Sequence, residues 1–171
     1  MSYLIICTIT VSLFLLHSVS DTLAQFPKLN IKDQNALSLN VTNAVYNSNT
    51  SEFLGSKNIS LTPYRITEQH YFDEGVLNNV GNVTNSQTFL NTYLSDDLLL
   101  GRGNGTIATT DGQNISWISS DIGRWIDNQW VFYGVMLFNN TDSESLSLLN
   151  NSIGLSKSTS GSEPDYIWLL E

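Results

Sequence analysis

The chain has 171 residues, a single cysteine, and a formal net charge of −9 from 7 basic and 16 acidic residues. This excess of negative charge repels phosphate backbones and anionic lipid, which argues against nucleic acid as a partner. The cysteine is Cys7, close to the N-terminus. The domain that follows must therefore be held together by its core and its hydrogen bonds, without a disulfide.

Residues 1–24 have the features of a signal peptide. Residues 3–16 form a mostly apolar run, and Thr22-Leu23-Ala24 then has the small-x-small form of a cleavage site. The run is shorter than the roughly 20 apolar residues of a membrane-spanning helix, and no later stretch reaches that length. Because no Lys or Arg precedes the run, an uncleaved N-terminal anchor is the alternative. We expect a secreted or cell-surface protein.

Asn-x-Ser/Thr triplets are frequent after residue 24, where the content of Asn, Ser and Thr would give about four by chance. Such triplets are N-glycosylation acceptors in exported proteins when they are exposed. The alternative is that an Asn-rich chain forms them incidentally. The eight candidate asparagines are Asn40, Asn49, Asn58, Asn82, Asn104, Asn114, Asn139 and Asn150.

The exported chain divides into a polar leader, residues 25–57, and a β-rich domain, residues 58–171. A short alternating stretch at Leu37, Leu39 and Val41 predicts that part of the leader is a strand. From Asn58 onward, alternating apolar residues and turn signals predict a series of short strands. The predicted strands cover residues 59–61, 67–77, 83–94, 98–110, 113–126, 129–138, 153–157 and 165–170.

Asp111-Gly112 is a strong hairpin signal, because both central positions of a tight turn need positive φ. A two-residue loop there predicts that Arg102 pairs with Asp121, which would join opposite charges across the strands. The apolar alternation shifts between Trp117 and Ile122. A β-bulge in this strand would move the position of Arg102 by one residue.

Asp127-Asn128 is predicted to form the next tight turn. A two-residue loop there pairs Trp125 with Trp130 and Gly123 with Phe132, and both pairs are favourable cross-strand neighbours.

Residues 130–138 are apolar on both faces of the predicted strand, so both faces need cover. In a barrel, one face would point inward. The other would be covered by a short helix at residues 143–150, by the leader or by a second molecule. The prediction is an all-β fold, a closed antiparallel meander barrel of about eight strands, with one short helix near 143–150.

The second half of the chain resembles a group of small prokaryotic, chiefly archaeal proteins that have no established function. The resemblance rests on Gly101-Arg102-Gly103-Asn104-Gly105, Thr110-Asp111-Gly112, Trp117, Ile122-Gly123-Arg124 and Ile167-Trp168. It implies a lipocalin-like (calycin) β-barrel. The C-terminus departs from the acidic-Trp-basic ending of that group. Because the group has no assigned catalytic residues, none can be carried over to this chain.

The chain after residue 24 offers few catalytic groups. His70 is its only histidine, so neither a zinc site nor any other metal site is expected, and no cofactor motif is present. A Ser-His-Asp triad lacks a nucleophile elbow. On a strand, His70 would share its face with Glu74 but not with Asp73, and a surface histidine is the simpler interpretation. The glycines at 101–105 lack the Gly-Lys-Ser/Thr of a phosphate loop.

Two functions remain open. The first is the binding of a small apolar ligand inside the barrel, with Trp117, Phe132 and Tyr133 as lining residues. Alternation places Phe132 and Tyr133 on opposite faces unless a bulge intervenes, and the tryptophans could instead form the core. The second is a surface or interaction glycoprotein with a filled barrel. An enzyme that uses barrel carboxylates is a third and weaker hypothesis. An open cavity would favour the first function.

We expect the exported protein to begin at or near Gln25, because the small-x-small motif ends at Ala24. Intact mass spectrometry or N-terminal sequencing of the exported material checks this. A retained Met1 together with membrane association would instead identify an anchor.

Overall fold

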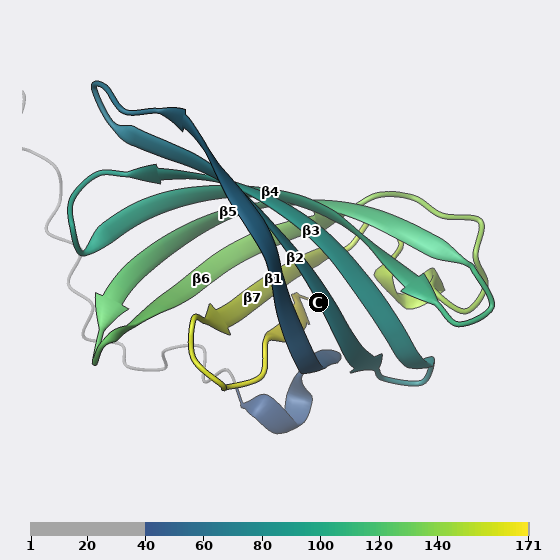
Figure 1. The fold of residues 1–171 in the computed structure, drawn as a ribbon. Coiled ribbons are helices and arrows are strands. Elements are labelled where there is room, and N and C mark those ends of the chain that lie inside the picture. The colour runs from purple at the N-terminus through teal and green to yellow at the C-terminus, as the bar shows by residue number, and fades with distance from the viewer. Residues whose placement is uncertain (1–39, 171) are drawn as a thin grey trace, which may run out of the picture. The chain divides into compact units, whose positions relative to one another are not determined.

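The structure is a computed structural model that describes residues 40–170. The expected signal peptide and residues 25–39 of the expected leader lie outside these residues. Eight strands hydrogen-bond in chain order and close into an antiparallel barrel (Figure 1). They are β1 (Tyr46–Ser60), β2 (Arg65–Leu77), β3 (Gly81–Tyr93), β4 (Leu98–Thr109), β5 (Asn114–Ile126), β6 (Gln129–Phe138), β7 (Ile153–Thr159) and β8 (Tyr166–Leu170).

The predicted all-β meander barrel of about eight strands is therefore confirmed. The barrel begins with β1 at Tyr46, inside the stretch that the sequence assigned to the leader. The reason is that Tyr46 is 1% exposed and belongs to the core, so the polar segment around it is a barrel strand. Within residues 40–170, no helix has the length and apolar character needed to cross a membrane.

The short helix expected at residues 143–150 is absent. This segment contains only a 3-10 turn, η2 (Ser147–Leu149), and a second such turn, η1 (Val41–Asn43), precedes β1. Polar side chains in the segment bond to nearby backbone groups: Ser143 Oγ accepts from Leu146 N at 3.1 Å, and Asn150 Oδ1 accepts from Thr141 N at 2.7 Å. Such local hydrogen bonds compete with a helical backbone and favour turns.

The tight turn between β5 and β6 is confirmed. Trp125 pairs with Trp130, and Gly123 pairs with Phe132. Asp127 and Asn128 have φ angles of 51° and 63°. Positive φ at both central positions matches the right-handed twist of the flanking strands.

The turn between β4 and β5 is one residue longer than predicted. Arg102 pairs with Ser120, and Asp121 pairs with Gly101. Thr109 N donates to Gln113 O, which leaves a three-residue loop in which Gly112 has a φ of 86°. A single positive φ at the end of the loop is typical of three-residue hairpins.

No bulge lies between Trp117 and Ile122, because β5 pairs continuously with β4 and β6 across this stretch. Strict alternation turns Trp117 and Asp121 inward, while Ile118 and Ile122 lie on the outer face and are about half exposed. The shift in apolar pattern therefore marks the point where the interior becomes polar.

The hydrophobic core fills one end of the barrel, where the β2–β3 and β4–β5 turns and the segment 139–152 lie. Leu146 and Leu149 from that segment are fully buried against it. At the opposite end of the barrel, the inward-facing side chains of the strands line a cavity. The core residues are Tyr46, Leu77, Val83, Ile107, Ile115, Trp117, Met136, Phe138, Leu146, Leu149 and Ile167.

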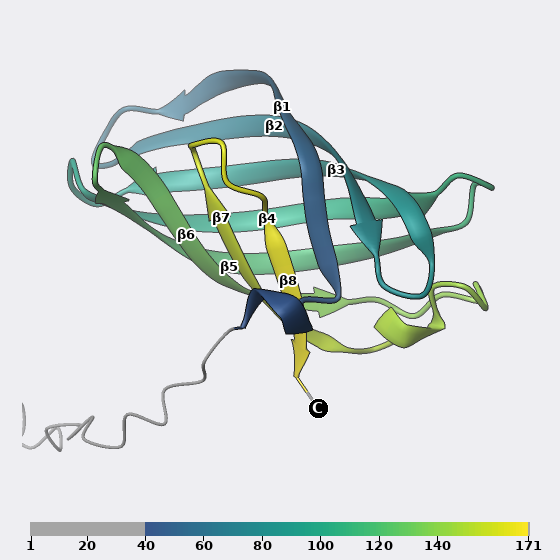
Figure 2. The ribbon, with the colours of Figure 1, turned by 90° about the horizontal axis from the view of Figure 1, so that it is seen from below.

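A short seam between β1 and β8 closes the barrel (Figure 2). Only two residue pairs form its ladder, Tyr46 with Ile167 and Asn47 with Tyr166. Ser48 and Asp165 extend the seam: Ser48 N donates to Asp165 O at 2.9 Å, and Asp165 N donates to Ser48 Oγ at 2.7 Å. The seam thus fixes Asp165 at the edge of the interior.

We predict an excitonic couplet between Trp125 and Trp130 in far-UV circular dichroism, because their rings lie 5.6 Å apart at 70°. Trp125→Phe and Trp130→Phe should each abolish the same couplet. Trp168→Phe is the control, since Trp168 lies on β8 and should leave the couplet intact. A spectrum that neither of the first two replacements changes would contradict the register of this hairpin.

Candidate functional site

A cavity of about 490 Å³ occupies the interior of the barrel. Inward side chains of the strands line it, and the loop between β7 and β8 borders it through Ser160, Gly161 and Glu163. This volume falls in the range of roughly 300–1,000 Å³ that is typical of small-molecule sites. The lining combines aromatic rings, side-chain amides and carboxyl groups. Its chemically important members are Phe53, Tyr71, Phe89, Tyr93, Trp117, Trp130, Phe132, Gln69, Asn85, Gln87, Asn91, Asp73, Asp121 and Asp165.

Glycines on the inner face make room for these side chains. A Cβ atom at Gly103 would lie 2.5 Å from both Phe89 Cε1 and Ser119 Oγ, and one at Gly134 would collide with Asp121 Oδ1. A Cβ atom at Gly123 would lie 2.7 Å from Phe132 Cε1. Bare backbone at these positions therefore allows the neighbouring rings and carboxyl groups to lie against the wall.

Two groups of aromatic rings line the cavity. In the first, the ring of Phe89 lies 6.1 Å from Tyr71 and 6.1 Å from Trp117, measured between centroids. In the second, the ring of Trp130 lies 6.0 Å from Tyr93 and 6.2 Å from Phe132. These separations suit edge-to-face and offset packing, which holds the rings in defined orientations.

Side-chain amides form a polar belt between the rings. Asn91 Nδ2 donates to Gln69 Oε1 at 2.8 Å, and the Tyr71 hydroxyl donates to the same oxygen at 3.0 Å. Trp117 Nε1 donates to Asn85 Oδ1 at 3.0 Å. Hydrogen bonds to this belt therefore hold the side chains of Tyr71 and Trp117 in place, in addition to their packing.

Three aspartates place carboxyl groups in this interior. Asp73 is 0% exposed; its Oδ2 accepts a hydrogen bond from Gln87 Nε2, and its Oδ1 has no hydrogen-bond partner within residues 40–170. The Tyr46 hydroxyl, also buried, has no partner among these residues either. Asp121 Oδ2 accepts from Ser119 Oγ at 2.9 Å. Buried polar groups without partners are rare and costly in a domain of this size.

Burial raises the pKa of Asp73 to about 6 and that of Asp121 to about 6, because the interior solvates a carboxylate less well than water does. For Asp165, burial together with the nearby charge of Asp73 raises the pKa to about 7. Burial and the charges of Asp73 and Asp165 raise the pKa of the Tyr46 hydroxyl. Asp73, Asp165 and Tyr46 therefore form one electrostatically coupled group.

Two of the three predicted lining residues, Trp117 and Phe132, line this cavity. Tyr133 lies on the outer face and is 52% exposed, because β6 pairs with β5 and β7 without a bulge and alternation turns Tyr133 away from Phe132. The sequence reasoning missed the three aspartates. The signal was present in β5, where Ser119 and Asp121 follow Trp117 at spacings of two residues.

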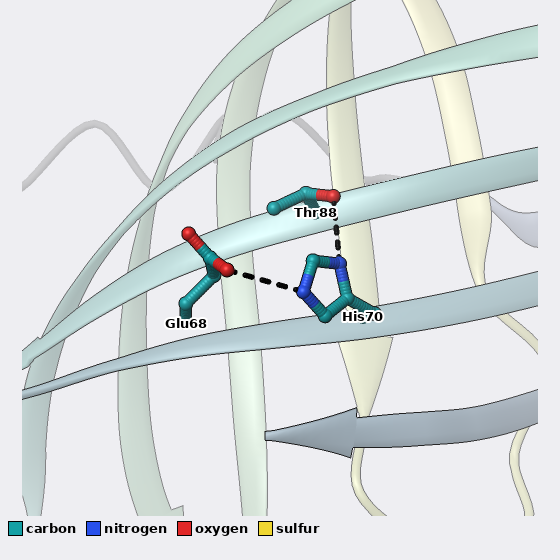
Figure 3. A network of polar contacts seen from close by, with 3 residues as sticks. All are labelled: Glu68, His70 and Thr88. Carbon is teal, nitrogen blue, oxygen red and sulfur yellow. Dashed lines mark hydrogen bonds and ion pairs between the residues drawn. The ribbon is translucent and has the colours of Figure 1, made fainter. Parts of the chain in front are cut away.

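His70 lies on the outer face of β2, apart from the cavity. Its Nδ1 is 3.0 Å from Thr88 Oγ1 and its Nε2 is 3.2 Å from Glu68 Oε1, so its partners are Thr88 and Glu68 rather than Glu74 (Figure 3). An open depression of about 610 Å³ lies around His70 and the outward Ile118. Because it holds no buried polar group without a partner, we regard the interior cavity as the stronger candidate site.

Seven of the eight candidate glycosylation asparagines are exposed, and the eighth is Asn150. The Asn150 side chain is half-buried; it accepts from Thr141 N at 2.7 Å and donates to Thr141 O at 3.0 Å. A glycan on Asn150 would be attached at Nδ2, the atom that donates to Thr141 O.

Within residues 40–170, no three His, Cys, Asp or Glu side chains come together in a way that could hold a metal ion. Comparison with protein-family models, curated proteins and solved structures found no match. The candidate site therefore rests on the geometry and chemistry of the cavity alone.

We predict that Asp121→Asn stabilises the protein at neutral pH. The folded protein keeps the Asp121 proton to a higher pH than the unfolded chain, so the stability linked to this group is full below about pH 4 and is lost as pH rises through about 6. The replacement should raise the free energy of unfolding by about 1–3 kcal/mol at about pH 7.5. It should also make the free energy of unfolding change less between about pH 4.5 and about pH 7.5.

Urea unfolding at the two pH values measures both effects. Asp142→Asn, at an exposed position outside the strands, is the control and should change neither value. An Asp121→Asn protein that keeps the full pH dependence of the parent would contradict the buried state of this carboxyl group.

Proposed function

We propose that this protein is a small-molecule binding module whose ligand enters the barrel and lies with an apolar part against the aromatic lining. The observation that carries the proposal is the interior cavity of about 490 Å³, walled by the rings of Tyr71, Phe89, Trp130 and Phe132. Burying apolar ligand surface against such rings contributes about 25 cal/mol per Å², which is enough for micromolar affinity in a ligand of modest size.

The cavity favours this function over a glycoprotein with a filled barrel. In a filled barrel, apolar side chains would pack the interior throughout, whereas here the packed core occupies one end, and glycines such as Gly103 and Gly123 let Phe89 and Phe132 lie against the wall at the other. Asp73 and Tyr46, each with a buried polar atom that has no partner within residues 40–170, also belong to the lining of this interior. A void with such groups is costly unless something binds there.

Export, N-glycosylation and kinship with the small archaeal calycin-like proteins remain part of the proposal. The exposure of seven of the eight acceptor asparagines supports glycosylation, and the closed eight-stranded meander is compatible with the calycin-like barrel. Glycans on the outer face and a ligand inside are compatible, because they use opposite faces of the same strands.

Titration with N-phenyl-1-naphthylamine, a neutral apolar fluorescent probe, tests the proposal. We expect a saturable rise in probe fluorescence with micromolar affinity, accompanied by quenching of the cavity tryptophans. Ser119→Phe should reduce the probe affinity by about tenfold or more, because Ser119 lines the cavity and a ring at this inward position would occupy part of its volume.

Ser120→Phe is the matched control, since Ser120 is the adjacent residue and its side chain is exposed on the outer face. It should bind the probe like the parent protein. Circular dichroism verifies that both variants retain the barrel. The absence of saturable binding by the parent protein, or equal loss in the two variants, would refute an interior site.

A further inference from the structure

The charge of the cavity lining restricts the ligand further. Asp73, Asp121 and Asp165 face the interior, and only one lining residue is basic, Lys157. The Lys157 ammonium pairs with Glu163 Oε2 at 3.2 Å, where the β7–β8 loop borders the cavity. No other lining residue offsets the three carboxyl groups, so the cavity disfavours a carboxylate or phosphate ligand and favours a cation.

Asp73 supplies the specific acceptor for such a cation. It is fully buried, lines the cavity, and leaves Oδ1 without a hydrogen-bond partner among the described residues. Gln87 on β3 already donates to the other oxygen, and Ser51 on β1 is the cross-strand neighbour of Asp73. A buried carboxylate oxygen that accepts nothing is strongly stabilised by a charged donor.

The aromatic lining suits the same ligand. Tyr71 is close enough to the carboxyl groups that the charges of Asp165 and Asp73 raise its pKa, after burial and the neighbouring Tyr93. Aromatic faces attract organic cations through their quadrupoles, most strongly where water is excluded. The Tyr93 ring already contacts one cation in this way, because the guanidinium of Arg65, an exposed residue outside the lining, lies 3.6 Å from its centre.

We propose that the cavity recognises a small organic amine, whose ammonium group lies beside the carboxyl groups of Asp73 and Asp165 and whose apolar body lies against the rings of Tyr71 and Phe89. This inference rests on the proposed binding function and adds the chemical class of the ligand. The volume of about 490 Å³ accommodates a bicyclic aromatic amine with space to spare. Asp121, whose carboxyl group lies against the backbone of Gly134, offers a second acceptor for a polar substituent.

The proposal predicts that binding depends on pH. The groups that face Asp73 are Tyr46 and Ser51 from β1, Gln87 from β3, and Asp165 from the end of the β7–β8 loop. An ammonium ligand binds best when Asp73 is ionised. The pKa values of Asp73 and Asp165 are raised to about 6 and about 7. Affinity for the amine should therefore fall as pH decreases from about 8 to about 5, while affinity for a neutral analogue stays constant.

Isothermal titration calorimetry with tryptamine, tryptophol and indole-3-acetate tests the inference, because these three probes share one ring system and differ in charge. At about pH 8 we expect tryptamine to bind about tenfold tighter than tryptophol or better, and indole-3-acetate to bind weakest. Asp73→Asn should remove most of the preference for tryptamine over tryptophol. Asp142→Asn removes one negative charge at an exposed position, so it is the control for a long-range effect of net charge on binding.

The outcomes separate the two proposals. Equal binding of tryptamine and tryptophol, or tightest binding of indole-3-acetate, overturns the amine inference and leaves the binding function standing. No binding of these probes or of N-phenyl-1-naphthylamine overturns both. If Asp73→Asn does not fold, the three-probe series and its pH dependence on the parent protein decide the question, with Asp165→Asn as the second variant. A tryptamine affinity that does not change between about pH 8 and about pH 5 contradicts a carboxylate contact.

Discussion

The structure depends on a seam of very few hydrogen bonds that joins the first strand to the last. β1 and β8 share only two residue pairs, and Ser48 and Asp165 add the bonds that continue the seam toward the cavity. Once the sheet is closed, every strand has one inner and one outer face, and no edge remains along the seam. Asp165 belongs to the closure and to the cavity lining at once, so fold and candidate site share this residue.

The interior is divided between two tasks. At one end, Leu146 and Leu149 plug the barrel and complete an apolar core that supplies the stability. At the other end, Asp73 and Asp121 are buried without basic partners, which destabilises the folded state at neutral pH. Retaining such groups at the expense of stability is characteristic of binding sites, where a ligand supplies the missing partner.

The outer face compensates in part for the polar interior. Leu100, Ile122 and Tyr133 are successive cross-strand neighbours on β4, β5 and β6, and Ile118 and Leu137 form a parallel row. These side chains are about half exposed, yet they cover one another across the strands and thereby stabilise the sheet. The apolar face of β5 therefore points outward in the half of the barrel that encloses the cavity, which is the reverse of an ordinary core strand.

Local signals in the sequence determined β2 to β8, whereas most of the polar strand β1 was assigned to the leader. They also determined one hairpin, because Asp127-Asn128 needs only its own backbone preferences to set the pairing of Trp125 with Trp130. The loop at Gly112 differed by one residue, since Asp-Gly suits both two- and three-residue turns. Only the tertiary structure decided which face of each strand is inside. The sequence reasoning assumed that apolar residues mark the interior, which placed Tyr133 in the cavity and overlooked Asp73, Asp121 and Asp165. Closure of the barrel and the filling of one end fixed those orientations, and both depend on contacts far apart in the chain.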